Sequence, residues 1–345
     1  MVKLFSKLFK TDLGIDLGTS TTKVYQKSRG IVYDQPTVIA IQKITEDKQK
    51  VIALGDEAKL LLGKTPESVQ ALCPIQESVI HDYQPTELML KEIFAKLLGS
   101  SFSFKPVVLI TVPIGITEVE KRAVRDSVLS AGARAVHLVS EPLASAIGSN
   151  LAVSESSGTL LLDIGGGTTE VALLSMKGFV FTKSLRVGGA KMDDAIVNYV
   201  RKKYSLLIGE TTAEQAKLAL SDCILAEETT PNFVEIKGRD LVRGTPRTAE
   251  ISNFDIREAI DDSLRLILST VRLALENIPP ELASDIVENG LTLTGGVASM
   301  KNLDHLFSRA LNLPVYVPEM SRLCAVEGLG KMLSMEDSFL EFAIE

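Results

Sequence analysis

The sequence reads DLGTSTTKV over Asp16–Val24 and DIGGGTTEV over Asp163–Val171, and the two stretches are identical at five of nine positions. They lie 147 residues apart, which is about the length of a domain. Each stretch follows one apolar run and precedes another, so each predicts two strands joined by a tight turn. The repeat therefore predicts a fold of two similar halves that each carry one such hairpin.

The turns of both hairpins have the composition of a phosphate site. Glycine and small hydroxyl residues allow successive backbone N–H groups to point at one anion. The first turn would contribute Gly18, Thr19, Ser20 and Thr21, and the second Gly165, Gly166, Gly167 and Thr168. Taken singly, either turn is as well explained by ordinary turn formation. The duplication favours two turns that hold a polyphosphate between two domains.

An aspartate stands at the matching strand end before each turn, Asp16 in the first copy and Asp163 in the second. Mg²⁺ keeps several waters and takes one or two carboxylates together with phosphate oxygens. Two convergent aspartates satisfy that need, either as direct ligands or through water. The alternative is that each aspartate only shapes its turn.

Glu141 is a candidate for the hydrolytic step. It lies between a predicted strand and a helix that Pro142 begins, where a side chain is aimed into a cleft. A carboxylate there can orient or deprotonate the water that attacks a γ-phosphate. Its alternative role is a favourable charge at a helix N-terminus.

Four residues are candidates for the nucleoside. Gly295 and Gly296 follow the predicted strand Leu291–Thr294, and glycines there let a flat ring approach the backbone. Glu214 and Lys217 lie three residues apart on one predicted helix and would reach a ribose and a base edge. The alternative for this second pair is a surface ion pair.

Strands and helices alternate along the chain, which predicts an α/β architecture. The predicted strands include Leu13–Leu17, Lys23–Tyr25, Ile31–Ile41, Val107–Val112, Val136–Val139, Thr159–Asp163, Val171–Leu174 and Leu291–Thr294. Capping boxes at Thr117 and Thr212 predict two helix starts. Asn253 is the predicted cap of a long helix over Phe254–Asn277. The polar stretch Ser221–Arg247 predicts a small strand-rich appendage.

Composition excludes several classes of protein. The 345 residues carry a formal net charge of −7, so no basic surface for nucleic acid is expected. The three cysteines and three histidines are scattered, which argues against a disulfide framework or a zinc site and favours a reducing compartment. No uncharged stretch reaches the length of a membrane span.

The first ten residues, MVKLFSKLFK, differ from the rest. Their apolar residues recur at helical spacing with lysines around them, namely Met1, Leu4, Phe5 and Leu8. This pattern predicts either a short amphipathic helix on an anionic membrane surface or a helix packed on the protein's own body.

These motifs resemble the actin-like ATPase superfamily, and a longer set resembles its MreB family of bacterial actins. The matching stretches include IDLGTSTTKVY, VPIGITEVEKRAV, EPLASAIGSNL, LLDIGGGTTEVALLS, VGGAKMDDAIVNYVR, LLIGETTAEQAK, GRDLVRGTPR, PPELASDI and LTGG, from Asp12 to about Gly330. The resemblance implies an actin-like ATPase fold, with two similar α/β halves around a nucleotide cleft and a smaller subdomain on each half. The implied parts are a membrane helix over residues 1–10, subdomain IA over 11–31, 75–142 and 315–345, IB over 32–74, IIA over 143–182 and 251–314, and IIB over 183–250.

The resemblance also implies roles for the candidate residues. Asp16 and Asp163 would serve Mg²⁺, the two turns would bind the phosphates of ATP, and Glu141 and Thr168 would position the hydrolytic water. The remaining four, Glu214, Lys217, Gly295 and Gly296, would line the nucleoside pocket. The implied activity is a slow Mg-dependent ATPase coupled to polymerisation.

The implied assembly is an antiparallel double protofilament at the inner face of the cytoplasmic membrane, where it organises lateral cell-wall synthesis with partners such as RodZ and MreC. The terminal helix would be the membrane anchor, and Phe102 and Phe104 a second apolar contact. Many weak anchors on one filament add up to firm binding.

Two departures and two alternatives accompany this resemblance. Val297 stands where the family carries a third glycine, and a β-branched residue resists positive φ. The stretch Ser221–Asn232 also departs from the family pattern. The alternatives are a soluble phosphotransferase of the sugar-kinase type and a nucleotide-binding scaffold on the same fold.

Overall fold

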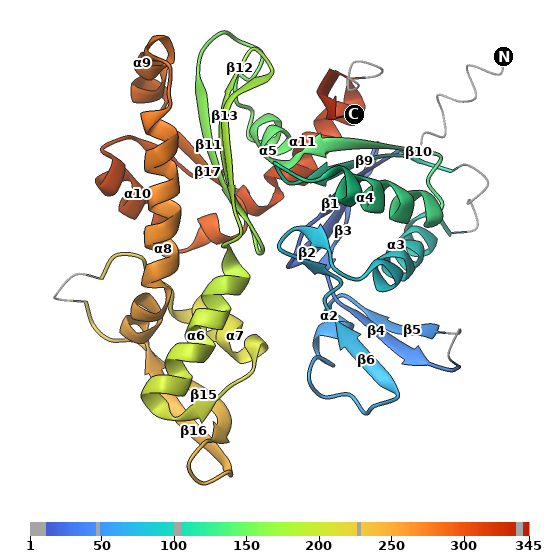
Figure 1. Ribbon diagram of the computed structural model, residues 1–345, viewed down its shortest axis with the longest axis vertical. Helices are drawn as coiled ribbons and strands as arrows, with labels where there is room; N and C mark the ends of the chain where they lie inside the picture. Colours follow the sequence, from blue (N-terminus) through green and yellow to red (C-terminus); the bar gives the residue numbers. More distant parts are fainter. Residues whose placement is uncertain (1–11, 46–48, 100–104, 226–228, 336–340, 345) are drawn as a thin grey trace. The chain divides into compact units, whose positions relative to one another are not determined.

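The computed structural model describes residues 12–45, 49–99, 105–225, 229–335 and 341–344. The chain divides into two compact units. The first contains the residues up to Val153 and those from Leu323 onward, and the second contains Ser154–Arg322. The last segment of the chain therefore returns to the unit in which the chain began (Figure 1).

The first unit is built on a six-stranded sheet of order β19-β10-β9-β1-β2-β3. Its strands are β1 (Leu13–Leu17), β2 (Thr21–Gln26), β3 (Gly30–Pro36), β9 (Val107–Val112), β10 (Ala135–Ser140) and β19 (Ala343–Ile344). The first three strands pair antiparallel, whereas β1, β9 and β10 run parallel, and β19 is antiparallel to β10.

Helices cover both faces of this sheet, so β1 is buried along its whole length, including Asp16 near its end. The helices are α3 (Tyr83–Leu98), α4 (Glu118–Ser130), α5 (Glu141–Gly148) and α11 (Cys324–Ser334), preceded by the short turn η3 (Ser321–Leu323). Leu13 and Ile15 join one core with Phe94 of α3 and Val128 of α4. Gly14 faces the opposite side, where an added Cβ would lie only 2.7 Å from a side-chain carbon of α11.

A small sheet extends the first unit. Its elements are β4 (Ile39–Lys43), β5 (Gln49–Leu54), α2 (Asp56–Lys59) and β6 (Val69–Leu72), followed by the pair β7 (Ile75–Gln76) and β8 (Val79–Ile80). The sequence predicted one strand over Ile31–Ile41, and this prediction is wrong because the strand breaks after Pro36. Thr37 is held at the break, since its backbone N–H donates to Ser20 O and its hydroxyl donates to Gly18 O.

The second unit repeats the strand order of the first. Its sheet has the order β13-β12-β11-β17-β18. The strands are β11 (Thr159–Ile164), β12 (Thr169–Ser175), β13 (Gly178–Leu185), β17 (Leu291–Thr294) and β18 (Val315–Tyr316). An antiparallel run of three strands is again followed by parallel ones. The prediction of two similar halves, each with its hairpin, is confirmed.

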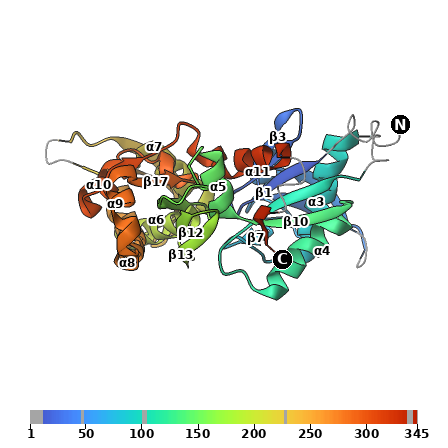
Figure 2. The ribbon, with the colours of Figure 1, turned by 90° about the horizontal axis from the view of Figure 1, so that it is seen from above.

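The remaining elements of the second unit are α6 (Gly189–Tyr204), β14 (Leu206–Leu207), α7 (Glu210–Leu220), β15 (Phe233–Asp240), β16 (Pro246–Ser252), α8 (Asn253–Glu276), α9 (Pro280–Asn289), η2 (Val297–Ser299) and α10 (Leu303–Leu311). The orange helices α8, α9 and α10 lie together in both ribbon views (Figures 1 and 2). Among the described residues, no helix is both long and apolar enough to cross a bilayer.

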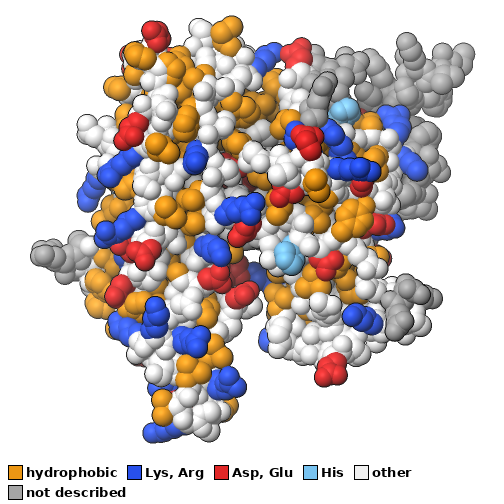
Figure 3. Space-filling model, viewed as in Figure 1, with side chains coloured by type: hydrophobic (Ala, Val, Ile, Leu, Met, Phe, Trp, Pro, Cys, Tyr) orange, Lys and Arg blue, Asp and Glu red, His pale blue; other side chains and the backbone are white. Residues whose placement is uncertain are grey.

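The expected strand-rich appendage is the three-stranded sheet β14-β15-β16. Its long hairpin carries exposed basic side chains near its end, among them Arg239, Arg243 and Arg247. Several blue side chains gather at the lower left of the space-filling view, where this hairpin lies (Figure 3). Gly238 is required inside it, since a Cβ there would lie 2.3 Å from Leu207 O of the neighbouring strand. The appendage is thus fixed to the unit by close backbone contact.

Three predicted helix caps can be compared with the structure, and one of them is confirmed. The capping box at Thr117 is confirmed, with both of its reciprocal hydrogen bonds present. The predicted capping box at Thr212 is wrong, because α7 begins one turn earlier, at Glu210, after Gly209. The cap of α8 is Ser252 rather than Asn253, and Asp255 completes a capping box with it.

Candidate functional site

The first hairpin holds a buried carboxylate. Asp16 lies near the end of β1 and is only 4% exposed. Its Oδ2 accepts a 2.8 Å hydrogen bond from Lys23 Nζ, and its Oδ1 accepts one of 3.2 Å from Thr111 Oγ1. Lys23 comes from β2, and Thr111 comes from β9, so both neighbouring strands fix the carboxylate.

Glu141 belongs to the same electrostatic group. It is the first residue of α5 and directly follows β10, so the helix begins one residue before the predicted start at Pro142. Burial alone would lower the pKa of Lys23, but the charge and hydrogen bond of Asp16, aided by the charges of Glu141 and Asp34, outweigh it and hold that pKa above its ordinary value. Lys23 is therefore a cation that donates a hydrogen bond to Asp16 and lies within reach of the charge of Glu141.

The first turn is tightly closed. Gly18 N donates to Thr21 O at 3.2 Å, and an added Cβ on Gly18 would lie 2.9 Å from that same oxygen. Thr19 Oγ1 accepts from Ser78 N at 2.8 Å, which ties the turn to the segment after β7. The amides of the two residues inside the turn take no part in its closing bond, and they fit the role of phosphate donors.

The second hairpin repeats these features in its own unit. Asp163, also 4% exposed, lies near the end of β11 and accepts a 2.7 Å hydrogen bond from Thr294 Oγ1 of β17. Gly165 N donates to Thr168 O at 2.9 Å and closes the turn. Gly295 packs against the aspartate with φ +88°, and an added Cβ would lie 2.7 Å from Asp163 Oδ1.

The start of α6 lies against the second turn, a contact that the sequence patterns did not predict. Two amides at the start of α6 donate to the turn, Gly189 N to Gly165 O at 3.0 Å and Ala190 N to Gly166 O at 2.8 Å. Gly188 must be glycine here, because a Cβ would lie 2.6 Å from Gly165 O. The start of α6 therefore supports the candidate phosphate loop from behind.

Lys217 lies against that helix start. Its Nζ donates to Gly189 O at 2.7 Å and to Asp193 Oδ2 at 2.9 Å. Burial raises the pKa of Asp193 to about 6, with Lys217 opposing the shift and Glu214 and Asp194 adding to it. Of the predicted nucleoside pair, Lys217 is thus engaged within the protein, and Glu214 lies close enough for its charge to act on Asp193.

The expected difficulty at Val297 does not arise. Positive φ falls on Gly295, whereas Gly296 has ordinary helical angles and Val297 begins the turn η2. Val297 is buried beside Gly189, where it contributes to packing. A β-branched residue is therefore accommodated without backbone strain.

The structure brings the candidates together within each unit. The first unit groups Asp16 and Glu141 around Lys23, and the second groups Asp163, its turn, Gly295 and Lys217. The sequence patterns did not single out residues whose role depends on a partner from another element, namely Lys23, Thr37, Thr111, Gly188, Asp193 and Thr294. The candidate membrane residues lie outside the described residues, namely Met1, Leu4, Phe5, Leu8, Phe102 and Phe104.

The buried aspartates suit Mg²⁺ with phosphate better than a metal held by protein alone. Within the described ranges, no group of three or more histidine, cysteine, aspartate or glutamate residues is arranged to hold a metal ion. Mg²⁺ that is bound with a nucleotide does not require such a group, since phosphate and water complete its shell. Each carboxylate, with the closed turn beside it in its own unit, therefore has the chemistry to contribute to such a site.

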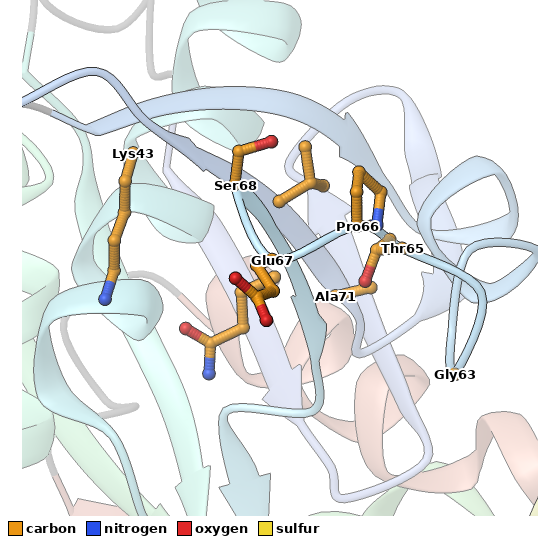
Figure 4. Close-up of a pocket in the computed structure, with 9 residues that line it drawn as sticks. Lys43, Gly63, Thr65, Pro66, Glu67, Ser68 and Ala71 are labelled. Atoms are coloured by element: carbon orange, nitrogen blue, oxygen red, sulfur yellow. The ribbon is translucent and has the colours of Figure 1, made fainter.

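A surface pocket coincides with a stretch that resembles the end of a P-loop. Gly63 and Thr65 line it beside Lys43 and Glu67 (Figure 4). A P-loop needs a strand before it and a helix after it. Here the helix α2 comes first and the strand β6 follows, so the pocket is not a phosphate loop of that kind.

Comparison with known proteins then identifies the family. The model of the MreB/Mbl protein family matches residues 10–341. The chain belongs to the MreB/Mbl family. It is 45% identical to the cell shape-determining protein MreB of Escherichia coli (strain K12) over 339 residues, covering 98% of this chain and 97% of that protein. Identity to the cell shape-determining protein Mbl of Bacillus subtilis (strain 168) is 38% over 330 residues, covering 96% and 98%.

A solved structure of the MreB family confirms the fold. MreB5 of Spiroplasma citri bound to ADP superposes with a TM-score of 0.89 at 32% identity, covering 96% of this chain and 98% of that one. The same protein bound to AMPPNP gives a TM-score of 0.88 at the same identity, covering 96% and 99%. The fold is thus the actin-like fold of the MreB/Mbl family, whose named members determine cell shape.

Proposed function

We propose that this chain is a cell-shape protein that binds ATP with Mg²⁺, hydrolyses it slowly and self-assembles into filaments on a membrane surface. The observation that carries the proposal is the duplicated hairpin, because each copy ends in a buried aspartate and a closed turn of small residues. The ADP and AMPPNP bound to MreB5 support a nucleotide as the ligand.

The two hairpins are proposed to bind the phosphates. Backbone amides inside the turns Gly18–Thr21 and Gly165–Thr168, other than those of Gly18 and Gly165 that close the turns, would donate to phosphate oxygens, while Asp16 and Asp163 hold Mg²⁺ directly or through water. Bound Mg²⁺ would neutralise charge on the phosphate oxygens. Lys23 and Thr111 hold the Asp16 carboxylate in one orientation through hydrogen bonds to its two oxygens, so it is placed to accept the ion.

Glu141 and Thr168 are proposed to position the attacking water. Glu141 begins α5 at the end of β10, a rigid place from which its carboxylate can accept a hydrogen bond from water. Thr168 is buried at the end of the second turn, where its hydroxyl would hold the same water. Two fixed acceptors orient a water without strong activation, which agrees with slow hydrolysis.

Four residues are proposed for the nucleoside. Gly295 adopts the positive φ that turns the chain after β17, and nothing lies within 4 Å of the Cβ position of Gly296, which leaves room there for a flat ring. Glu214 would accept hydrogen bonds from the ribose. Lys217, whose Nζ is engaged by Gly189 and Asp193, would contribute through its stem and its charge.

The larger assembly follows from the resemblance and is part of the proposal. Residues 1–10 would anchor the filament to the inner face of the cytoplasmic membrane, with Phe102 and Phe104 as a second contact. The filament would be an antiparallel pair of protofilaments of four-subdomain subunits. RodZ and MreC are the proposed partners, and lateral cell-wall synthesis is the proposed process.

Co-sedimentation with liposomes tests this function. The full chain, a variant without residues 1–9, Asp163→Ala and the exposed control Asp262→Ala would be mixed with anionic vesicles and Mg-ATP, and the pellets imaged by negative stain. We expect paired filaments on lipid for the full chain and the control, filaments off lipid without residues 1–9, and none for Asp163→Ala. A chain that binds ATP but stays monomeric throughout would refute the filament and favour a phosphotransferase.

A further inference from the structure

We propose that Asp193 is a positioning residue for the second phosphate loop, which it holds through Lys217 and the first residues of α6. The inference rests on the proposed nucleotide function and assigns a role to a residue that does not itself touch the loop. In this role, Asp193 helps to hold the second phosphate loop in its binding conformation before a nucleotide binds.

The contact begins with a buried ion pair between two helices. Lys217 on α7 and Asp193 on α6 have side chains that are 9% and 14% exposed. Lys217 Nζ lies 2.8 Å from Asp193 Oδ1 and donates a hydrogen bond of 2.9 Å to Oδ2. The same Nζ donates to Gly189 O at 2.7 Å. Asp193 thus holds the lysine in the place from which it reaches the start of α6.

The contact ends on the phosphate loop. Gly189 uses its carbonyl for Lys217 and its N–H for Gly165 O, and the next amide, of Ala190, donates to Gly166 O. There is little room for adjustment, because a Cβ on Gly189 would lie 3.3 Å from Lys217 Nζ. Two peptide groups at the start of α6 therefore connect the ion pair to the loop. A shift of Lys217 would move the amides of Gly189 and Ala190, which donate hydrogen bonds to the loop carbonyls.

The charge of Asp193 makes this arrangement sensitive to pH. Burial raises the pKa of its carboxyl to about 6, Lys217 opposes the shift, and Glu214 of α7 and Asp194 of α6 add to it. As pH falls through 6 the carboxylate takes up a proton and its attraction for Lys217 is lost. Nucleotide affinity should then weaken, because the loop is less firmly held.

Nucleotide titration separates this role from a general structural one. Binding of a fluorescent ADP analogue with Mg²⁺ would be measured at pH 7.5, 6.5 and 5.5 for the full chain, Asp193→Asn and the control Asp194→Asn, which makes the same change on the next, more exposed residue. The nucleotide's phosphates also titrate in this range, so the quantity compared is the ratio of variant Kd to unmodified Kd at each pH.

We expect Asp193→Asn to raise Kd about tenfold at pH 7.5, and the ratio to fall toward one at pH 5.5, where the unmodified carboxyl is protonated. Asp194→Asn should give a ratio near one at every pH. A ratio for Asp193→Asn that is constant across pH, or near one at pH 7.5, would overturn the inference.

Hydrogen exchange on the unmodified chain provides a test that needs no folded variant. After correction for the intrinsic pH dependence of exchange, the amides of Gly189 and Ala190 should lose protection between pH 7.5 and 5.5 while those in the middle of α8 keep theirs. Unchanged protection at the start of α6 would contradict the inference. If the unmodified chain binds no nucleotide, the proposed function fails, and the exchange result still decides whether Asp193 positions the loop.

Discussion

At the scale of single residues, Lys23 shows how a buried charge is made tolerable. The side chains of Lys23 and Asp16 are 8% and 6% exposed, and Lys23 Nζ lies 2.8 Å from Asp16 Oδ2. Each charge compensates the loss of water around the other, and Thr111 adds a hydrogen bond to the aspartate. The first hairpin thus holds an ion pair of Lys23 and Asp16, of which the sequence motif predicted only Asp16.

Removing one member should be costly. Lys23→Met leaves the Asp16 carboxylate buried with a threonine and no cation, so we expect the free energy of unfolding to fall by about 3–5 kcal/mol. Urea denaturation followed by circular dichroism measures this. The double variant Asp16→Asn/Lys23→Met removes both charges and should recover a large part of the loss. If the double variant is as unstable as Lys23→Met, the lost stability comes from packing of the lysine stem.

At the scale of elements, helix starts depend on which hydroxyl reaches the free amides. The Ser252 hydroxyl accepts from Asp255 N at 3.2 Å, and Asp255 Oδ2 accepts from Ser252 N at 2.8 Å. Thr212 has the sequence of a capping box but lies inside α7, whose first residue is Glu210. Capping chemistry is local, but the chain offers more candidate boxes than it has helix starts.

Matched alanine variants test this difference. Ser252→Ala should lower the free energy of unfolding by about 1 kcal/mol, because an amide at the start of α8 loses its acceptor. Thr212→Ala should change it by no more than about 0.5 kcal/mol, since no cap is lost. Thermal and urea unfolding of both variants measure the contrast. Equal effects would show that the hydroxyl of Ser252 does not act as a cap.

At the scale of the whole molecule, a helix from the end of the chain completes the first unit. The helices α5 and α11 meet at two glycines, and an added Cβ would lie 1.8 Å from Cys324 O at Gly148 and 1.9 Å from Ala144 O at Gly328. Lys331 of α11 donates to the carbonyls of Ile147 and Gly148 at the end of α5. The helix that begins with Glu141 is thus held by residues that follow the entire second unit.

This contact predicts a long-range effect on the site. Gly328→Ala places a methyl group against backbone that cannot rotate away, so we expect a loss of stability of about 2–3 kcal/mol and slower ATP hydrolysis through displacement of α5. Gly209→Ala is the control, because nothing lies within 4 Å of its Cβ position. Urea unfolding and phosphate release measure the two effects. Normal values for both in Gly328→Ala would contradict the helix contact.

Features that depend on consecutive residues could be predicted from the amino-acid sequence. The repeat predicted two halves with matching hairpins, and both sheets show the same strand order because a strand–turn–strand unit is specified by consecutive residues. The candidate turns and the place of Glu141 at a helix start followed from the same kind of signal. The division into four subdomains stays a prediction.

Tertiary structure alone decided the partners of the site residues. Asp193 meets Lys217 across two helices, Thr294 reaches Asp163 from a strand 131 residues away, and positive φ falls on Gly295, so that Val297 is tolerated. These pairings join residues far apart in sequence, and no local pattern specifies which polar group a buried charge will meet. The physical reason is that desolvation demands some partner, while only the packed fold decides which one is within reach.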